Sequence, residues 1–299
     1  MRALVCPGQG SQKKGFLSPW LEIEGVREHL ERLSEAAGID LIHYGTEAEE
    51  ETIKDTAIAQ PLIVAAGIVT GRLALRELDG EELIFAGHSV GEITAAALAG
   101  VLSDEDAMRF VRVRANGMAE AAAASPTGMA AVLGGVEENV REAIDAAGLV
   151  AANSNGGGQI VAAGPIPAIE AFAANPPARA RVIPLKVAGA FHTEAMAPAV
   201  PALEEFAASL QVSDPTSALL TNRDGSAVAS GEEFVKTLVS QVTSPVRWDL
   251  CMATLLEREV AGIIEVAPAG TLVGLAKRAM RGVPGTSINI PEDLASLKG

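Results

Sequence analysis

One short segment leaves the chain little conformational choice: a serine between two glycines, in the run G-H-S-V-G at residues 87–91. The apolar residues 83–86 before it predict a buried strand, and the alanine-rich residues 92–99 after it predict a helix with an acid in its first turn. A strand, a sharp turn and a helix, with Ser89 at the apex, form the pattern of a nucleophile elbow, where glycines tolerate backbone strain and close contacts. Two interpretations remain at this point: a catalytic serine, which the context favours, and a small residue in a tight turn.

The order of the other predicted elements divides the chain into two parts. Residues 1–125 alternate between strands and helices, which predicts a parallel sheet covered by helices on both faces. Residues 126–188 instead read as strand, helix, strand, strand, helix and strand, which is the ferredoxin-like order. After this segment the alternating pattern returns. We therefore expect an α/β catalytic core, residues 1–125 and 189–299, that carries an inserted ferredoxin-like subdomain.

Composition and charge exclude several functional classes. The chain has 299 residues and a net charge of −15, which argues against binding to nucleic acid or to anionic membrane surfaces. No apolar run approaches the length of a membrane span, and the apolar stretch at the N-terminus is too short for a signal peptide, so we expect a cytoplasmic protein. Cys6 and Cys251 are far apart and fit no metal or redox motif. We expect both to be buried thiols, and we expect no metal site.

A serine nucleophile needs a base, and the chain offers four histidines. His29 sits in the polar pattern of an amphipathic helix, and His43 follows a short apolar run. His88 adjoins Ser89, and neighbouring side chains should diverge there. His192 ends an apolar run and follows the serine in sequence, as an elbow enzyme requires, so it is the favoured base; the alternative is a satisfied loop histidine. No acid between Ser89 and His192 has a distinctive setting, but a backbone carbonyl could orient the imidazole instead.

Two further features call for a chemical role. Residues 6–12, C-P-G-Q-G-S-Q, place a glycine-rich loop after the first strand, but Lys13 stands where a dinucleotide fingerprint would have its third glycine. This loop could offer backbone N–H groups to an oxyanion, or it could be an ordinary strand-end turn. Arg109, Arg112 and Arg114 lie on different faces of one predicted helix. Any of them that turned inward would need an anion as its partner.

Several separated motifs together resemble the malonyl-CoA:acyl carrier protein transacylase family over essentially the whole chain. Their order and spacing carry the resemblance, because each motif alone would be weak. The motifs are PGQGSQ (7–12), GHSVGE (87–92), VRANGM (113–118), NSNGGGQIVAAG (153–164), GAFH (189–192), SQVTSPVRW (240–248) and AGTLVGLAKR (269–278). The resemblance implies an α/β-hydrolase-like core with a parallel sheet and a ferredoxin-like subdomain.

The resemblance also implies a catalytic apparatus. Ser89 is the implied nucleophile, which becomes malonylated, and His192 is its general base. The backbone carbonyl of Gln241 is implied to hold the imidazole, which accounts for the missing acid. The backbone N–H groups of Gln9 and Val90 are implied to form the oxyanion hole.

Substrate selection follows from the same resemblance. Arg114 is implied to pair with the free carboxylate of the malonyl group. Phe191, together with Val90, resembles the malonyl-selective form of the family, so we expect methylmalonyl groups to be excluded. Asn153 and Asn155 match a polar motif near the site, and their role stays open.

The implied substrates are malonyl-CoA and the phosphopantetheine thiol of an acyl carrier protein, with no tightly bound cofactor. The resemblance also implies an acidic carrier protein, so a local basic patch must overcome the repulsion from a chain that is itself negative. The candidates are Lys277, Arg278 and Arg281 in the last predicted helix, with Lys13 and Lys14 beside the glycine-rich loop. The alternative for each group is solvated surface charge. We expect the enzyme to act as a monomer.

Three other functions compete with this one. A serine esterase or thioesterase would share the elbow and His192, but it would more typically show an HGGG-type loop and an acid partner. A malonyl loading enzyme of a polyketide pathway would carry the same motifs. A non-enzymatic acidic binding module would leave Ser89 without any acyl group after contact with malonyl-CoA.

Overall fold

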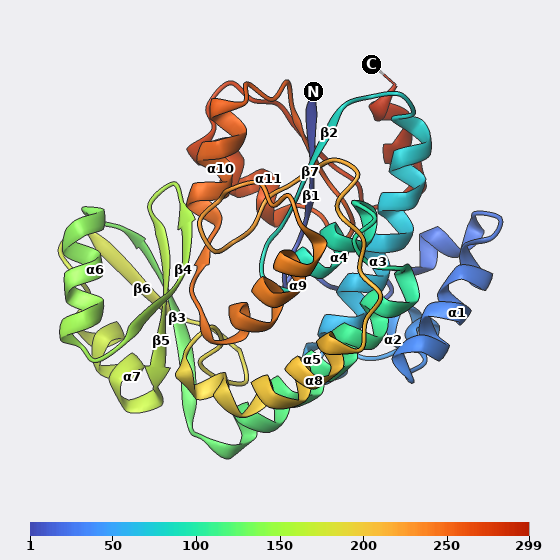
Figure 1. The fold of residues 1–299 in the computed structure, drawn as a ribbon. Coiled ribbons are helices and arrows are strands. Elements are labelled where there is room, and N and C mark those ends of the chain that lie inside the picture. The colour runs from blue at the N-terminus through green and yellow to red at the C-terminus, as the bar shows by residue number, and fades with distance from the viewer. Residues whose placement is uncertain (299) are drawn as a thin grey trace.

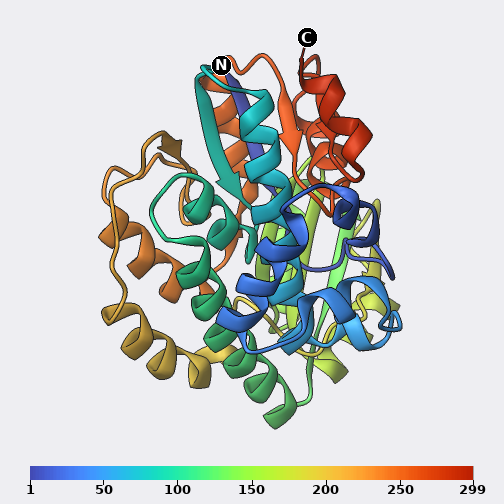
Figure 2. The same ribbon diagram turned by 90° about the vertical axis from the view of Figure 1, so that its right-hand side faces the viewer.

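A parallel sheet forms the centre of the larger part of the molecule (Figure 1). The computed structural model describes residues 1–298. The strands follow the order β10-β9-β1-β2-β7, and each neighbouring pair is parallel, as the alternating pattern predicted. Their bounds are β1 Arg2–Cys6, β2 Leu83–Gly87, β7 Ala218–Leu219, β9 Ile263–Glu265 and β10 Gly285–Ser287. Both views place the two chain termini at the same end of the molecule (Figure 2).

Helices cover both faces of this sheet, because successive side chains of a strand point to opposite sides. The helices are α1 Val26–Ala37, α2 Leu41–Thr46, α3 Thr56–Glu77, α4 Gly91–Leu98, α5 Asp104–Ala124, α8 Val200–Ala208, α9 Gly231–Ser240, α10 Trp248–Glu257 and α11 Thr271–Ala279. Shorter 3-10 helices are η1 Ser18–Glu22, η2 Thr52–Lys54, η3 Glu194–Ala199, η4 Gln241–Thr243 and η5 Pro291–Leu297. Leu4 and Cys6 of β1 belong to one buried cluster with α3, α4 and α5. Ala3 and Val5 belong to another with α10 and α11.

Helix α3 corrects one expectation from the sequence. It is long and apolar enough, by length and composition, to cross a membrane, so the statement that no run approaches this length is wrong. However, 78% of the apolar window is buried inside the protein. A Cβ on Gly71 would lie 2.4 Å from Leu98 Cδ1, so the helix packs closely against α4. Burial on all sides explains why the helix is apolar all round.

A second sheet lies beside the first and has the order β6-β3-β5-β4-β8 (Figure 1). Its elements are β3 Thr127–Gly134, α6 Glu137–Ala146, β4 Val150–Gly156, β5 Gln159–Pro165, α7 Ile166–Ala174, β6 Ala180–Pro184 and β8 Val246–Arg247. The elements between residues 127 and 184 follow the expected strand and helix order. They enclose a small core of their own, which includes Val132, Ile144, Ile160 and Phe172. Strand β8 comes from the far end of the chain and pairs in parallel with β4, so the C-terminal part of the chain is joined to this sheet.

Some elements differ from the sequence pattern for simple reasons. Residues 193–210 read as one helix, but the chain forms η3 before α8, in a segment that holds Pro198 and Pro201. Proline has no N–H to donate within a continuous α-helix. Strands β7, β8 and β10 have two or three residues each, which is too short for periodicity to reveal.

Candidate active site

Ser89 sits in a strained turn between β2 and α4, at the carboxyl end of the parallel sheet. Its φ angle is 54°, in the left-handed region that non-glycine residues rarely adopt. The neighbouring chain is very close: a Cβ on Gly91 would lie 2.2 Å from the backbone oxygen of Cys6. Asn222 braces the turn, because its Oδ1 accepts from Ser89 N at 2.8 Å and its Nδ2 donates to Gly87 O at 2.7 Å. No sequence signal pointed to Asn222, which lies 133 residues from the serine.

The fold brings His192 to Ser89 across 103 residues of sequence. Ser89 Oγ lies 2.7 Å from His192 Nε2, and His192 Nδ1 lies 2.9 Å from the backbone oxygen of Gln241. Burial, with a smaller contribution from the positive charge of Arg114, lowers the pKa of His192 to about 3. The imidazole is therefore neutral near pH 7. Since a carbonyl can only accept, Nδ1 carries the proton and Nε2 is free to take one from the serine.

The low pKa of His192 gives a testable pH dependence of stability. An unfolded histidine takes up a proton below about pH 6.5, whereas the native one stays neutral, so its contribution to stability is lost as the pH falls from 6.5 toward 3. Compared with His192→Gln, the wild-type protein should lose about 2 kcal/mol of unfolding free energy between about pH 8 and about pH 5. Urea unfolding of both proteins at each pH measures this difference. Parallel pH profiles would contradict it.

Arg114 is the arginine that turns inward, and its side chain is 1% exposed. Its Nη1 donates to Gln60 Oε1 at 2.7 Å, and its Nη2 donates to Gln241 Oε1 at 2.8 Å and approaches Ser89 Oγ at 3.5 Å. Burial lowers the pKa of Arg114 to about 10, so it remains charged near neutral pH. Its two partners, Gln60 and Gln241, are neutral amides, so they do not neutralise the positive charge of the guanidinium. Arg114 also keeps N–H groups near Ser89 that can donate to a further acceptor.

The other two arginines of α5 have different partners, outside this cluster. Arg109 pairs with Asp106 at 2.9 Å on the exposed side of the helix. Arg112 donates to the backbone oxygen of Ala57 at 2.8 Å. The sequence could not decide which of the three points inward, and it gave no sign of Gln60.

The backbone N–H groups of Gln9 and Val90 are candidates for an oxyanion hole. Gln9 follows β1 in the glycine-rich loop, Val90 precedes α4, and both line the cavity that contains Ser89. Within residues 1–298, neither N–H donates to another protein group. The loop is held close to the elbow, since a Cβ on Gly8 would lie 2.9 Å from His88 O. Free N–H groups in this position can stabilise a negative oxygen.

The cavity around Ser89 has a volume of about 560 Å³ and lies between the two sheets. Its wall combines Phe191 and Leu275, which lie outside residues 126–188, with Asn153 and Asn155 of β4. Asn155 Oδ1 lies 2.8 Å from His88 Nε2, so this asparagine is a hydrogen-bond partner of the histidine next to Ser89. Burial lowers the pKa of His88, which favours its neutral form. Asn153 lines the cavity beside it.

The basic side chains named as docking candidates are exposed, with one correction. Lys277 and Arg278 lie in the last turn of α11, whereas Arg281 follows the end of that helix at Ala279 rather than belonging to it. Arg278 also donates to Gln159 Oε1 at 3.3 Å. The two lysines beside the glycine-rich loop have different surroundings. Lys13 lines the cavity, whereas Lys14 pairs with Glu49 at 2.5 Å.

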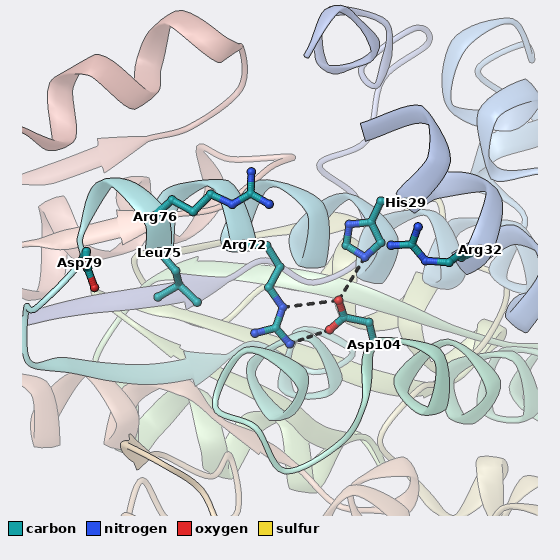
Figure 3. Close-up of a pocket in the computed structure, with 7 residues that line it drawn as sticks. All are labelled: His29, Arg32, Arg72, Leu75, Arg76, Asp79 and Asp104. Carbon is teal, nitrogen blue, oxygen red and sulfur yellow. Dashed lines mark hydrogen bonds and ion pairs between the residues drawn. The ribbon is translucent and has the colours of Figure 1, made fainter. Parts of the chain in front are cut away.

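A larger hollow of about 650 Å³ lies elsewhere, between α1, α3 and the start of α5 (Figure 3). Asp104 Oδ1 accepts from Arg72 Nη2 at 2.7 Å, and its Oδ2 lies 3.1 Å from His29 Nε2 (Figure 3). These contacts tie three helices together, and Ser89 does not line the hollow. Size alone therefore does not mark the reactive site.

Neither cysteine lines the cavity around Ser89. Cys6 and Cys251 are free and buried, and burial raises the pKa of both thiols. In the part of the chain that the structure describes, no group of three or more His, Cys, Asp or Glu side chains is arranged to hold a metal ion.

Comparison with known proteins gives a consistent result. Residues 3–290 match the acyl transferase domain family. The malonyl CoA-acyl carrier protein transacylase of Mycobacterium tuberculosis is 52% identical over 299 residues, covering 99% of each chain, and that of Escherichia coli is 32% identical, covering 98% of this chain and 97% of the relative. The crystal structure of MCAT from Mycobacterium tuberculosis superposes with a TM-score of 0.98 over the whole of both chains. A second neighbour, PlMCAT in complex with the type II PKS acyl-carrier protein AntF, has a TM-score of 0.91 at 29% identity, covering 99% of this chain and 98% of the other.

Proposed function

This chain belongs to the family of malonyl CoA-acyl carrier protein transacylases, and we propose that it moves the malonyl group through Ser89. The overall reaction transfers malonyl from malonyl-CoA to the phosphopantetheine thiol of an acyl carrier protein, which supplies fatty acid synthesis. One observation carries the assignment to Ser89: its Oγ lies 2.7 Å from His192 Nε2 and 3.5 Å from the buried guanidinium of Arg114. A nucleophile, a base and a carboxylate receptor thus meet at one point.

The first half of the reaction acylates the serine. Ser89 Oγ attacks the thioester carbonyl while His192 Nε2 takes the hydroxyl proton, and the N–H groups of Gln9 and Val90 receive the oxyanion. The tetrahedral intermediate collapses, the C–S bond breaks, and His192 returns the proton to the departing thiol. The carrier thiol then attacks malonyl-Ser89 by the same steps in reverse, which is ping-pong covalent catalysis.

The partner of His192 suits a transferase. The carbonyl of Gln241 fixes the ring and its tautomer at 2.9 Å, but it carries no full negative charge to stabilise an imidazolium. We infer that the resulting weaker base favours exchange between thioester and serine ester over activation of water. A hydrolase triad has an aspartate or glutamate at this position, which stabilises the imidazolium and so strengthens the base.

The chain organisation supports a further proposal about its parts. We assign residues 1–125 and 189–299 to an α/β-hydrolase-like core and residues 126–188 to a ferredoxin-like subdomain. The element order from β3 to β6, the strand order β6-β3-β5-β4 and the separate small core support the second assignment. The elbow at the end of β2 supports the first. The reactive cavity then lies where the two parts meet.

A carrier assay separates this function from a serine esterase. The protein is incubated with radiolabelled malonyl-CoA and then with a phosphopantetheinylated carrier protein. A transacylase moves the label to the carrier, whereas an esterase or thioesterase releases free malonate. An acyl mass on Ser89 after the first step also excludes a non-enzymatic binding module. Release of malonate without a labelled carrier would overturn the proposal.

Docking of the carrier gives a second expected result. We propose that the acidic carrier meets Lys277, Arg278 and Arg281, with Lys13 and Lys14, because Lys13 and residues 271, 272 and 275 of α11 line the cavity around Ser89. Reversal of Lys277 and Arg278 to glutamate should raise the apparent KM for the carrier by about 2- to 30-fold, from about 0.2–1 kcal/mol per exposed ion pair. Acylation by malonyl-CoA should be unchanged. The control reverses Arg27 and Lys236, exposed cations that do not line this cavity; equal KM values in both double variants would place docking elsewhere.

Exclusion of branched acyl groups gives a third expected result. Phe191 is 7% exposed and lines the cavity next to His192, so we propose that its ring occupies the space that a methyl branch would need. Phe191→Ser should raise the methylmalonyl-to-malonyl ratio of kcat/KM by about 10-fold or more. Kinetics with both thioesters measures this ratio. Comparable turnover of methylmalonyl-CoA by the wild-type protein would refute the steric argument.

We propose that the enzyme works as a cytoplasmic monomer without a tightly bound cofactor. The two free thiols suit a reducing compartment. One chain supplies every residue of the reactive cavity, so no second copy is needed to complete it.

A further inference from the structure

Glu92, in the first turn of α4, is a buried carboxylate that the reaction steps above do not use. Its side chain is fully buried, and within residues 1–298 it forms no direct ion pair. Its Oε1 accepts from Asn222 N at 2.6 Å, and its Oε2 accepts from Gln241 Nε2. A buried charge with only neutral contacts is costly unless a counter-charge lies near.

The counter-charge is the positive charge of Arg114, which is separated from Glu92 by the side-chain amide of Gln241. Since a carboxylate only accepts hydrogen bonds, Gln241 must turn its Nε2 toward Glu92, which leaves Gln241 Oε1 to face Arg114. Arg114 Nη2 donates to that oxygen at 2.8 Å. Glu92, Gln241 and Arg114 therefore form one chain. The carboxylate and the backbone oxygen of Ser89, which accepts from the same Nε2 at 3.1 Å, together fix the direction of the amide.

We infer that Glu92 is a positioning residue that serves as the counter-charge of Arg114 through Gln241 and so keeps the guanidinium open for the substrate carboxylate. A carboxylate in direct contact would occupy the fork by bidentate hydrogen bonding and compete with the malonyl group. No counter-charge at all would leave a buried cation uncompensated. The intervening amide avoids both difficulties. This inference rests on the proposed function and refines the role of Arg114 in it.

The electrostatics of the two groups agree with this geometry. Burial raises the pKa of Glu92 to about 7, while the hydrogen bonds from Asn222, Gln241 and Thr221 and, to a smaller extent, the charge of Arg114 act in the opposite direction. Glu92 is therefore largely ionised only above about pH 8, where its role as a counter-charge is complete. Burial likewise lowers the pKa of Arg114, and the charge of Glu92 opposes that shift. Each group thus favours the charged form of the other although they do not touch.

Glu92→Gln separates this role from support of the elbow. The new amide can keep an oxygen toward Asn222 N, so the Asn222 contacts that brace Ser89 can remain. Its NH₂ group would then face the NH₂ group of Gln241, and relief of that clash by rotation of Gln241 removes the acceptor from Arg114. Rotation of Gln241 also removes its Nε2 hydrogen bond of 3.1 Å to Ser89 O, but the Asn222 contacts still brace the serine, so the main effect of the substitution falls on Arg114.

The test compares kcat/KM for malonyl-CoA and acetyl-CoA in wild type, Glu92→Gln and a matched control, Glu265→Gln. Glu265 is also fully buried, but it accepts from the backbone at the start of α11 and does not contact Gln241 or Arg114. Glu92→Gln should reduce malonyl transfer by about 10- to 100-fold and acetyl transfer by less than about threefold. The ratio of the two should be unchanged in Glu265→Gln. Equal losses for both thioesters in Glu92→Gln would overturn the inference.

Two more variants keep the test decisive if Glu92→Gln folds poorly. In an Arg114→Ala background, adding Glu92→Gln should cause no further loss of malonyl transfer, and additive losses would refute action through Arg114. The double variant Glu92→Gln/Gln241→Glu moves the same charge into direct contact with Arg114. It should fold and yet lose the preference for malonyl, and retention of that preference would also refute the inference. Wild type that fails to label a carrier refutes the proposed function instead, so the two failures are distinguishable.

Discussion

Replacement of Ser89 by alanine is expected to abolish formation of the acyl-enzyme. The Oγ atom of Ser89 lies 2.7 Å from Nε2 of His192, the proposed base. Loss of a serine nucleophile in comparable hydrolases lowers turnover by about a million-fold. Intact-mass spectrometry after mixing with malonyl-CoA should show no added malonyl group. A malonylated Ser89→Ala protein would require a different nucleophile.

His192→Ala tests the base in the same experiment. Without an acceptor at Nε2 the serine hydroxyl keeps its proton, so acylation should slow by about 10³- to 10⁶-fold. The fold should survive both changes, and circular dichroism and unfolding curves provide that control. Because Ser89 and His192 act as a unit, the double variant should be no slower than the slower single variant. Multiplicative losses would mean that the two residues act independently.

Arg114→Ala is expected to change which acyl group the enzyme carries. Malonyl differs from acetyl by one carboxylate, and the buried guanidinium of Arg114, 3.5 Å from Ser89 Oγ, is placed to pair with that charge. Removal of one partner of a buried charge pair costs about 2–5 kcal/mol, or roughly 30- to several-thousand-fold in malonyl transfer. Acetyl-CoA has no such charge, so its transfer should not suffer the same loss. The malonyl-to-acetyl ratio should therefore shift strongly toward acetyl.

Arg114→Lys sharpens the same prediction. An ammonium restores the charge but lacks the planar fork that Gln60 and Gln241 hold in place, so rescue should be partial. The measurement is kcat/KM for both thioesters in all three proteins. Equal losses for malonyl and acetyl would mean that Arg114 supports the structure only. Arg112 or Arg109 would then be the next candidate for reading the carboxylate.

Local sequence patterns were sufficient for the parts of the fold whose causes are local. The glycines around Ser89 predict a turn that the backbone adopts, with φ of 54° at the serine. Ser103 stands just before α5, where serine is a favoured N-cap, and its side chain accepts from Asp106 N. The alternation of strands and helices predicts the parallel sheet, because each element must bury an apolar face. The same reasoning failed for 193–210, where two prolines interrupt a helical pattern, and for Arg281, which lies beyond the end of its helix.

The sequence by itself determined the sharp turn at Ser89 and the order of the longer elements, because a few neighbouring residues set backbone conformation and periodicity. The tertiary structure alone decided which side chains meet. Gln241 reaches Ser89 across 152 residues and Arg114 across 127, and no local pattern marks Gln60, Asn222 or the contacts of Glu92. Such partners depend on how helices rotate as their apolar faces pack, which is a property of the whole core. Packing of the core therefore decides which hydrogen bonds form, because a buried polar group pairs with a donor or acceptor on whichever element lies next to it.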